Sequence, residues 1–221
     1  KLASLLAGFG ILVAGLTGYY SYNSSRSMLL DAAERDLLTA TQVLGRSLQA
    51  SLAGASQDVR LLTTLPETRQ LSDLPTSNSA ARDELAATFN SLLRVHPEYL
   101  QIRLISLAEH GKERVRVERD GQQLTRVDGP QLQEKAHFPY VFEALNLKPG
   151  QVRLSSIVIN HEQGVHSGLD KPTLTISGPS DTDNTENSNL IVLNIDLNKL
   201  FKHHKANLPA QYQTYLSNEA G

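Results

Sequence analysis

The sequence predicts an α+β fold, in which an N-terminal transmembrane helix continues into a long helix packed on an antiparallel five-stranded sheet. Three observations lead to this prediction. An uncharged apolar run opens the chain, residues 24–65 hold leucines at helical spacing without a proline, and short segments rich in β-branched residues follow after residue 98. Strands joined by hairpins and covered by helices are typical of the α+β class.

Composition and charge narrow the classes of protein that the chain can represent. Its 221 residues carry 21 Lys and Arg against 23 Asp and Glu, a formal net charge of −2, which gives no electrostatic case for binding nucleic acid. Hydrophobic residues are 40% and charged residues 20%, which excludes wholesale disorder. The chain has no cysteine, so it has no disulfide framework, thiolate metal site or cysteine nucleophile.

Residues 1–23 predict a transmembrane anchor. The run 2–20 (LASLLAGFGILVAGLTGYY) has no charged side chain and would span about 28 Å as a helix, close to the hydrocarbon thickness of about 30 Å. Lys1 marks one end, and Tyr19, Tyr20 and Tyr22 mark the other, which predicts a cytoplasmic N-terminal side with the remainder outside. A cleaved secretory signal is the alternative, but the long apolar run and the tyrosines at its end disfavour it.

Residues 24–65 predict a membrane-exit and dimerisation helix. At about 1.5 Å per residue such a helix would be about 60 Å long, so its lower part needs packing on a second copy and its upper part on the lobe that follows. Gly10, Ala14 and Gly18, four residues apart in the anchor, also favour a homodimer. The alternative is a core helix broken near Gly45 or Gly54. The apolar stripe consists of Leu30, Leu37, Leu44, Leu48, Leu52, Ala55, Val59 and Leu62.

Residues 66–208 predict one mixed lobe. A helix over 79–95 ends at His96-Pro97, and Asp120-Gly121 predicts a hairpin turn. The polar run 181–189 predicts a looser hairpin, and residues 209–221 predict the start of a truncated second lobe. The predicted strands are 99–107, 113–118, 152–159, 173–177 and 190–197, with short helices in 131–145 around Pro139 and a helix over 197–208.

This order of segments resembles the double Cache (PAS-like) sensor domains that lie outside the cytoplasm in bacterial transmembrane receptors. The resemblance is carried by YLQIRLISLAEHGKERVRVERDG, QLQEKAHFPYVFEAL, GQVRLSSIVIN and LIVLNIDLNKL, and QYQTYLSNEAG resembles the entry into a second, membrane-proximal lobe. It implies a periplasmic domain anchored in the bacterial inner membrane that binds a small ligand and signals through its long helix. The implied output is a histidine kinase of a two-component system, a GGDEF/EAL protein acting on cyclic-di-GMP, or a chemoreceptor.

Strand alternation predicts which polar side chains share one face of the sheet. Arg103, Ser155 and Asp196 lie opposite apolar rows such as Ile191, Leu193 and Ile195, and Arg114 and Arg116 lie opposite Val115 and Val117. The resemblance implies a ligand cleft on the face away from the long helix, beneath the segment that contains His137 and Tyr140. The expected ligand-binding residues are therefore Arg103, Arg116, His137, Tyr140, Ser155 and Asp196.

The residue types favour a small organic anion or a zwitterion, because Arg binds carboxylates through two hydrogen bonds. The alternative is a solvated face with cross-strand ion pairs among Arg103, Glu113 and Arg116. The amino-acid-binding branch of the family has an Arg before its aromatic pair. This chain has His137 or Phe138 there, so the class of ligand stays open.

No catalytic or metal motif accompanies this face. His161 and His166, like the adjacent His203 and His204, lack a metal-ligand spacing, and no nucleophile with a base and an orienting group can be assembled. We therefore expect no cofactor, no metal and no enzymatic activity in this segment. A different class of function is a protein-interaction module that docks a periplasmic binding protein or a partner receptor.

Overall fold

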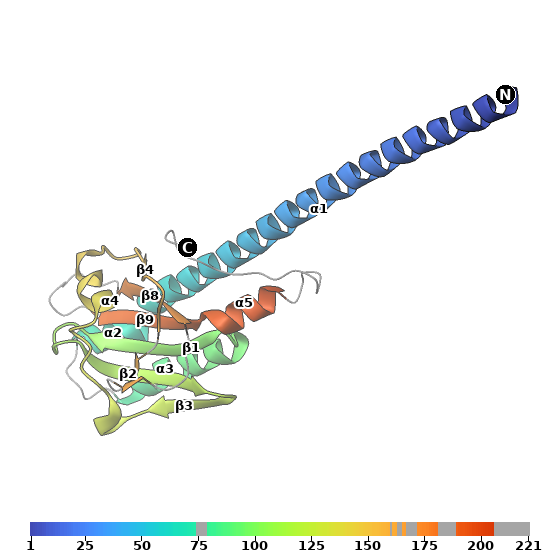
Figure 1. Cartoon of the computed structure of the whole chain (residues 1–221). Coiled ribbons are helices and arrows are strands. Elements are labelled where there is room, and N and C mark those ends of the chain that lie inside the picture. The colour runs from blue at the N-terminus through green and yellow to red at the C-terminus, as the bar shows by residue number, and fades with distance from the viewer. Residues whose placement is uncertain (74–78, 160, 163–164, 167–171, 181–188, 206–221) are drawn as a thin grey trace. The chain divides into compact units, whose positions relative to one another are not determined.

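In a computed structural model, the described residues are 1–73, 79–159, 161–162, 165–166, 172–180 and 189–205 (Figure 1). The chain divides into two compact units, residues 1–47 and 48–221. The predicted loop at 181–188 and the predicted start of a second lobe at 209–221 lie outside the described residues. The domain boundaries expected from the sequence stay predictions.

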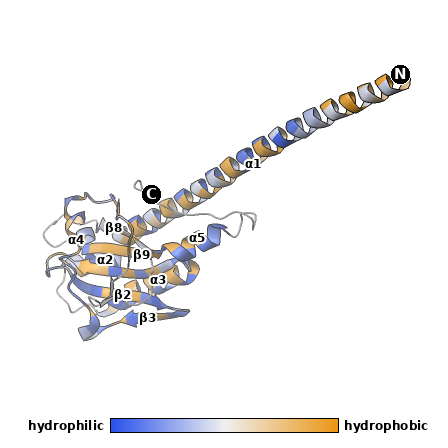
Figure 2. Ribbon diagram, viewed as in Figure 1, coloured by the Kyte–Doolittle hydropathy of each residue, from blue (hydrophilic) through white to orange (hydrophobic). Residues whose placement is uncertain are grey.

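A single helix, α1 (Leu2–Thr64), begins in the first unit and ends in the second. Its N-terminal part is long and apolar enough to cross a membrane, and Figure 2 shows mostly apolar colours over its first turns. Neither Gly45 nor Gly54 breaks the helix, so the alternative of a core helix broken near them is wrong. The helix ends just before Pro66, which opens α2 (Pro66–Asp73) because proline is tolerated in the first turn of a helix.

The second unit is built on a seven-stranded antiparallel sheet, which confirms the α+β class. The strand order is β3-β2-β1-β9-β8-β4, with β5 pairing beside β4 on β8. Its strands are β1 (Tyr99–Ser106), β2 (Lys112–Asp120), β3 (Gln123–Val127), β4 (Arg153–Leu154), β5 (Val158–Ile159), β8 (Pro172–Pro179) and β9 (Asn189–Asp196). A separate hairpin pairs β6 (His161–Glu162) with β7 (Val165–His166).

Two differences raise the number of strands above the five predicted. Gly121, with φ +59°, reverses the chain after β2, and the residues beyond the turn pair back as β3. The predicted strand over 152–159 is divided into β4 and β5, and both pair with β8.

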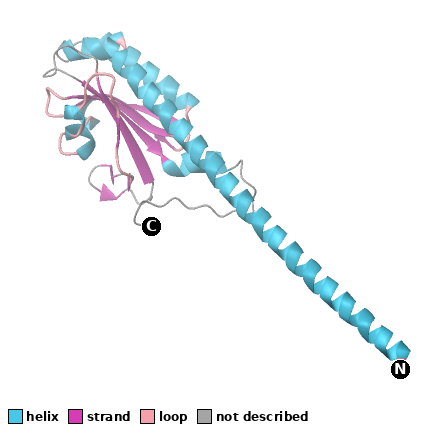
Figure 3. Ribbon diagram, turned by 90° about the horizontal axis from the view of Figure 1, so that it is seen from above, coloured by secondary structure: helices cyan, strands magenta, loops and turns pink. Residues whose placement is uncertain are grey.

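The two faces of the sheet carry different layers (Figure 3). On one face, residues 48–64 of α1 pack with α3 (Ser79–Val95) around a core that includes Val59, Leu62 and Phe89. On the other face, α4 (Pro139–Phe142) and the short helical turn η2 (Ala144–Asn146) form a smaller apolar cluster over Val192. A second short turn, η1 (Gly129–Gln131), follows β3 and has no buried residue. The predicted alternation in β9 is confirmed, because Ile191, Leu193 and Ile195 belong to the first core.

A β-bulge in β2 decides which charged side chains share a face. Leu104 pairs with Val115 but the next residue, Ile105, pairs with Glu113, so Arg114 is left without a partner across the ladder. The bulge brings Glu113 onto the face that holds Arg116, although the two are three residues apart. Arg114 instead donates to the backbone carbonyl of Leu71 in α2, so its predicted place beside Arg116 is wrong.

Candidate functional site

A cavity of about 330 Å³ opens on the sheet face opposite α1 and α3. Its floor comes from β1, β8 and β9, one wall from the segment over β4 and β5, and the other wall from the loop that leads into α4. Pockets of at least about 300 Å³ are typical sites for small ligands. The lining side chains are Arg103, Lys135, Phe138, Pro139, Tyr140, Glu143, Arg153, Ser155, Ser156, Val158, Thr173, Thr175 and Asn194.

Arg103 is the central polar group of the floor. It is 3% exposed, its Nη2 donates to Oδ1 of Asn194 at 3.3 Å, and its Nη1 lies 3.4 Å from Oε1 of Glu113. Thr175 donates to the same Asn194 oxygen at 3.2 Å. The Nε of Arg103 is buried and makes no hydrogen bond with the described residues. One donor of this guanidinium is therefore left for another acceptor.

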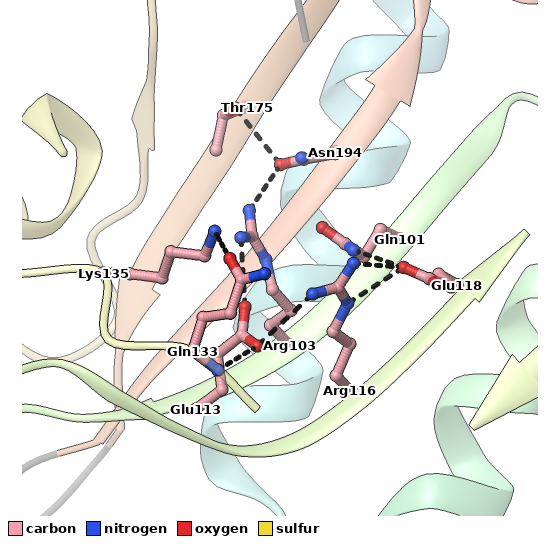
Figure 4. A network of polar contacts seen from close by, with 9 residues as sticks. All are labelled: Gln101, Arg103, Glu113, Arg116, Glu118, Gln133, Lys135, Thr175 and Asn194. Atoms are coloured by element: carbon pink, nitrogen blue, oxygen red, sulfur yellow. Dashed lines mark hydrogen bonds and ion pairs between the residues drawn. The ribbon is translucent and has the colours of Figure 1, made fainter. Parts of the chain in front are cut away.

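Behind the floor, charged residues of β1 and β2 form a continuous network (Figure 4). Glu113 is fully buried, and its Oε2 lies 3.5 Å from Nη1 of Arg116. Oε2 of Glu118 accepts hydrogen bonds from Nε of Arg116 and from Nε2 of Gln101, each at 2.9 Å. Ion pairs expected among Arg103, Glu113 and Arg116 do form, and they are buried rather than solvated. The Arg103–Glu113 pair crosses from β1 to β2, whereas the Glu113–Arg116 pair lies within β2.

Lys135 joins this network from a loop rather than from a strand. Gly111, with φ +73°, lies so close to Ala136 that a Cβ there would be 2.6 Å from the Ala136 nitrogen. The approach lets the Lys135 amide donate to the Gly111 carbonyl at 2.8 Å and the Glu113 amide donate to the Gln133 carbonyl at 2.9 Å. Lys135, 5% exposed, donates from Nζ to Oε1 of Gln133 at 2.6 Å.

Aromatic rings form the wall that faces the sheet. The rings of Phe138 and Tyr140 stack with centroids 5.5 Å apart, the ammonium of Lys135 lies 4.9 Å from the Phe138 centroid, and the guanidinium of Arg103 lies 5.3 Å from that of Tyr140. Burial raises the pKa of the Tyr140 hydroxyl, against the opposing effect of Arg103. Tyr140 therefore presents a neutral hydroxyl and an apolar ring face to the cavity at neutral pH.

At the mouth, an ion pair joins the two walls, and Ser155, just after β4, is hydrogen-bonded to β8. Nε of Arg153 lies 2.7 Å from Oε2 of Glu143, and both side chains are partly exposed. Such a pair contributes about 0–1 kcal/mol, so it adds little to the stability of the mouth. Ser155 is fixed by its amide, which donates to the Thr175 carbonyl at 2.8 Å, and by its Oγ, which accepts from the Thr175 amide at 3.0 Å.

Three of the six predicted ligand-binding residues, Arg103, Tyr140 and Ser155, line the cavity. The other three are not among the lining residues. Arg116 lies behind the floor in the charged network, and His137 is exposed with its ring against Phe138. Asp196 is buried, and its Oδ1 accepts from the Lys199 amide at 3.2 Å at the start of α5 (Leu197–Lys205). A side-chain oxygen there satisfies a free N–H of the first helical turn.

Several lining residues were not predicted, and the signals for them differ. Asn194 and Thr175 alternate with the apolar residues of β9 and β8, so strand parity was a usable signal for both. Lys135, Glu143 and Arg153 come from loops or from a two-residue strand, where no periodicity indicates direction. Among the described residues, no group of three His, Asp or Glu side chains could hold a metal ion.

Polar contacts fix residues 48–64 of α1 to the same sheet. The Tyr99 hydroxyl donates to Oδ2 of Asp58 at 2.6 Å, and burial together with Asp58 raises the pKa of Tyr99. Nε of Arg60 donates to the Gly150 carbonyl at 3.1 Å, at the end of the loop that carries α4. These contacts and the shared core connect α1 with both the sheet and the segment that covers the cavity.

Comparison with known proteins supports the fold. The model of the family described as "Bacterial histidine kinase, sensor domain" matches residues 55–217. No curated protein sequence matches the chain. Similar solved structures include the extracellular domain of vpHK1S-Z8, described as a histidine kinase, with a TM-score of 0.65 and 22% identity over 75% of this chain and 58% of that one.

Two further solved structures share the fold. A domain of a sensory box/GGDEF family protein from Vibrio parahaemolyticus has a TM-score of 0.66 and 22% identity over 75% of this chain and 61% of that one. Methyl-accepting chemotaxis protein X has a TM-score of 0.53 and 14% identity over 84% and 68% of the two chains. The chain thus spans about three fifths of the first two structures. These likenesses confirm the fold that the sequence resemblance predicts.

Proposed function

The chain belongs to the family of bacterial histidine kinase sensor domains, and from this membership we propose that it is the periplasmic input domain of a receptor anchored in the inner membrane. A small ligand binds in the cavity on the outer face of the sheet, and α1 carries its effect to a cytoplasmic output. The output proposed first is a histidine kinase; a GGDEF/EAL protein or a chemoreceptor are the alternatives. The chain itself acts as a sensor and not as an enzyme.

The observation that carries the ligand-binding proposal is the cavity, with one buried guanidinium at its floor and aromatic rings along its wall. A mostly apolar pocket with a few convergent polar groups is typical of small-molecule sites. The ligand can signal only if it prefers one of two arrangements of the domain. Shifts of about 1–2 Å at helix interfaces are a usual scale for such transitions.

A tryptophan placed at the cavity tests the proposal directly. The chain has no tryptophan, so Ser156→Trp puts a single fluorescent reporter on an exposed lining residue. We expect one class of amino acid, organic acid, amine, nucleoside or sugar to change its emission in a saturable way, because the bound molecule displaces water from beside the indole. The measurement is a fluorescence titration of the full chain in detergent micelles.

The matched control is Ser91→Trp, which places the reporter on an exposed position of α3, on the opposite side of the sheet. A ligand that changes both reporters equally acts on the micelle or on the whole fold. Two results would contradict a ligand site in this cavity. In the first, a compound changes the emission of Ser91→Trp in a saturable way but not that of Ser156→Trp. In the second, no compound changes the emission of either variant.

We also propose a homodimer formed through α1, and the absence of cysteine makes this testable. Leu30 and Leu37 are exposed within the first unit, 59% and 50%, as expected for residues that meet a second copy. Leu37→Cys should form a disulfide-linked dimer upon mild oxidation in membranes, because residues one heptad apart face the partner helix in a coiled coil. Non-reducing gel electrophoresis gives the crosslinked fraction.

Thr39→Cys is the control for this crosslink. Thr39 lies about 180° around the helix from Leu30 at 100° per residue, and its side chain is exposed. A disulfide forms only when the two Cα atoms approach within about 7 Å. Equal crosslinking of both variants would indicate random collision, and none at Leu37 would count against the dimer.

A second candidate function is docking of a periplasmic binding protein or a partner receptor. It is favoured by exposed apolar side chains near the cavity mouth, where Phe142, Leu145, Leu154 and Ile157 are each 42% to 60% exposed. Exposed apolar clusters often mark interaction sites. This function becomes the leading one if no small molecule changes the Ser156→Trp emission, and crosslinking in the periplasm then identifies the partner.

A further inference from the structure

We infer that residues 147–152, the bridging segment, connect the cover of the cavity directly to α1, and that Arg60 is the positioning residue that holds this connection. The cover is the part of the chain that includes α4 and η2, and it supplies Phe138, Tyr140 and Glu143 to the cavity lining. This connection rests on the proposed function, because it assigns the route by which the cavity would act on α1.

The bridging segment passes from one face of the sheet to the other. At its start, Leu147 packs with the apolar cluster of the outer face, which includes Val141 and Ala144 of the cover. At its end, Val152 packs against the core that α1 shares with α3 and the sheet. A displacement of the cover can therefore reach α1 around the end of the sheet, without a change in strand pairing.

Gly178 of β8 allows a close approach at the point of crossing. A Cβ at this position would lie 3.2 Å from the Gln151 carbonyl oxygen, from Cγ1 of Val152 and from Cγ1 of Val59 in α1. Carbon atoms in favourable contact lie about 3.5–4.0 Å apart, so a larger residue would push against both neighbours. Glycine thus lets α1 and the bridging segment pack against the same stretch of backbone.

The centre of the bridging segment is a tight turn. The Gln151 amide donates to the Lys148 carbonyl at 3.0 Å, and the Lys148 amide donates to Oε1 of Gln151 at 2.9 Å. Pro149 followed by Gly150, with φ +80°, is typical of a type II turn. Because the proline ring fixes φ and both hydrogen bonds close the turn, it passes on a displacement rather than absorbing it.

Arg60 fixes this turn to α1. Its Nε donates to the Gly150 carbonyl at 3.1 Å, across 90 positions of the sequence. The far side of the turn is fixed to the cover, because Nε of Arg153 lies 2.7 Å from Oε2 of Glu143. Coupling between two sites is reciprocal, so a contact by which α1 holds the cover also lets the cover act on α1. A ligand that prefers one position of the cover therefore biases α1 through this contact.

Hydrogen–deuterium exchange of the full chain in detergent micelles, read by mass spectrometry, tests the role of Arg60. Arg60→Met keeps an unbranched side chain of similar helix propensity but removes the donor to Gly150. We expect amide exchange in the cover to rise about three- to tenfold, the effect of one lost hydrogen bond, because the cover opens more often. The reporting amides are those of Val141, Glu143 and Leu147, which donate to the carbonyls of Phe138, Pro139 and Ala144.

Arg35→Met is the matched control. Arg35 also lies on α1, is exposed like Arg60, and donates from Nε to a backbone carbonyl at 3.1 Å, but that carbonyl belongs to Asp31 of the same helix. This variant should leave exchange in the cover unchanged. Equal exchange in the cover of both variants would overturn the role of Arg60.

Two further measurements distinguish positioning from a general loss of stability. Arg60→Lys should restore most of the protection of the cover, because an ammonium group also donates to a carbonyl. Urea unfolding should give the same midpoint for Arg60→Met as for the unaltered chain, because exposed substitutions change global stability little. Faster exchange that appears only with a lower urea midpoint, or that Arg60→Lys does not reduce, would count against the inference.

The Ser156→Trp titration tests the proposed function separately. If a compound binds in the cavity but Arg60→Met leaves exchange in the cover unchanged, the ligand site stands and the connection through Arg60 is overturned. If Arg60→Met speeds exchange in the cover but no compound changes the Ser156→Trp emission, the connection stands and the small-ligand sensor fails.

Discussion

Glu113→Gln should lower the free energy of unfolding by about 3–5 kcal/mol, because removal of one partner from a buried ion pair leaves uncompensated charge. Glu113 is fully buried and lies between the guanidinium groups of Arg103 and Arg116, at 3.4 Å and 3.5 Å. Glutamine keeps the shape but supplies no charge, so the two guanidinium groups lose the buried carboxylate that lies between them. Urea unfolding of the full chain in detergent micelles, followed by circular dichroism, measures the change.

Glu109→Gln is the control for this prediction. Glu109 also pairs with an arginine, Arg114, at 3.1 Å, but its side chain is 34% exposed. Partly exposed pairs contribute about 0–1 kcal/mol, so this variant should lose no more than that. If both variants lower the free energy of unfolding by similar amounts, the buried pairs of Glu113 contribute no more to stability than a surface ion pair does.

Leu62→Ala should lower the free energy of unfolding by about 2–5 kcal/mol, the range for removing a buried leucine side chain from a packed core. Leu62 lies near the end of α1, is 1% exposed and belongs to the core that α1 shares with α3 and the sheet. The cavity left by the substitution would loosen α1 from the sheet. The same urea experiment measures the loss of stability. The signal that we propose to pass from the cavity through α1 would weaken as well.

The adjacent residue provides a matched control. Leu61 is 57% exposed, so Leu61→Ala removes the same atoms from a solvent-facing position of the same helical turn. Its effect should stay within about 0.5 kcal/mol. An equal loss of stability for both leucine variants would mean that α1 does not pack on the sheet through Leu62. The proposed signal through α1 would then have no structural basis.

Much of the fold could be predicted because it is encoded in local periodicity. Val59 and Leu62 belong to a helical apolar stripe, and the alternation in β9 places Leu193 in the core as expected. What periodicity did not show is how segments pair. β3 forms only because the chain beyond Gly121 finds β2, and the predicted strand over 152–159 is divided where its central residues leave β8.

The candidate site was predictable to a smaller extent. Parity identified Arg103, which lies on β1, and Ser155, whose amide extends the pairing of β4 with β8 by one residue, because direction in paired extended chain follows from sequence position. It could not identify Lys135, whose place depends on the close approach of Gly111 to Ala136. Asp196 has the parity expected of a cavity residue, yet it lies at the end of β9, where its oxygen accepts from the first turn of α5.

The sequence by itself determined the apolar N-terminal segment, the long helix, the α+β class and the family resemblance, because each depends on residue order within one segment. Only the tertiary structure decided the bulge at Arg114, the burial of Glu113 between two arginines and the closing of the loop over the sheet. These features depend on contacts between residues far apart in the chain. No local pattern records them, because their free energy arises only when the strands, the bulge and the loop are packed together.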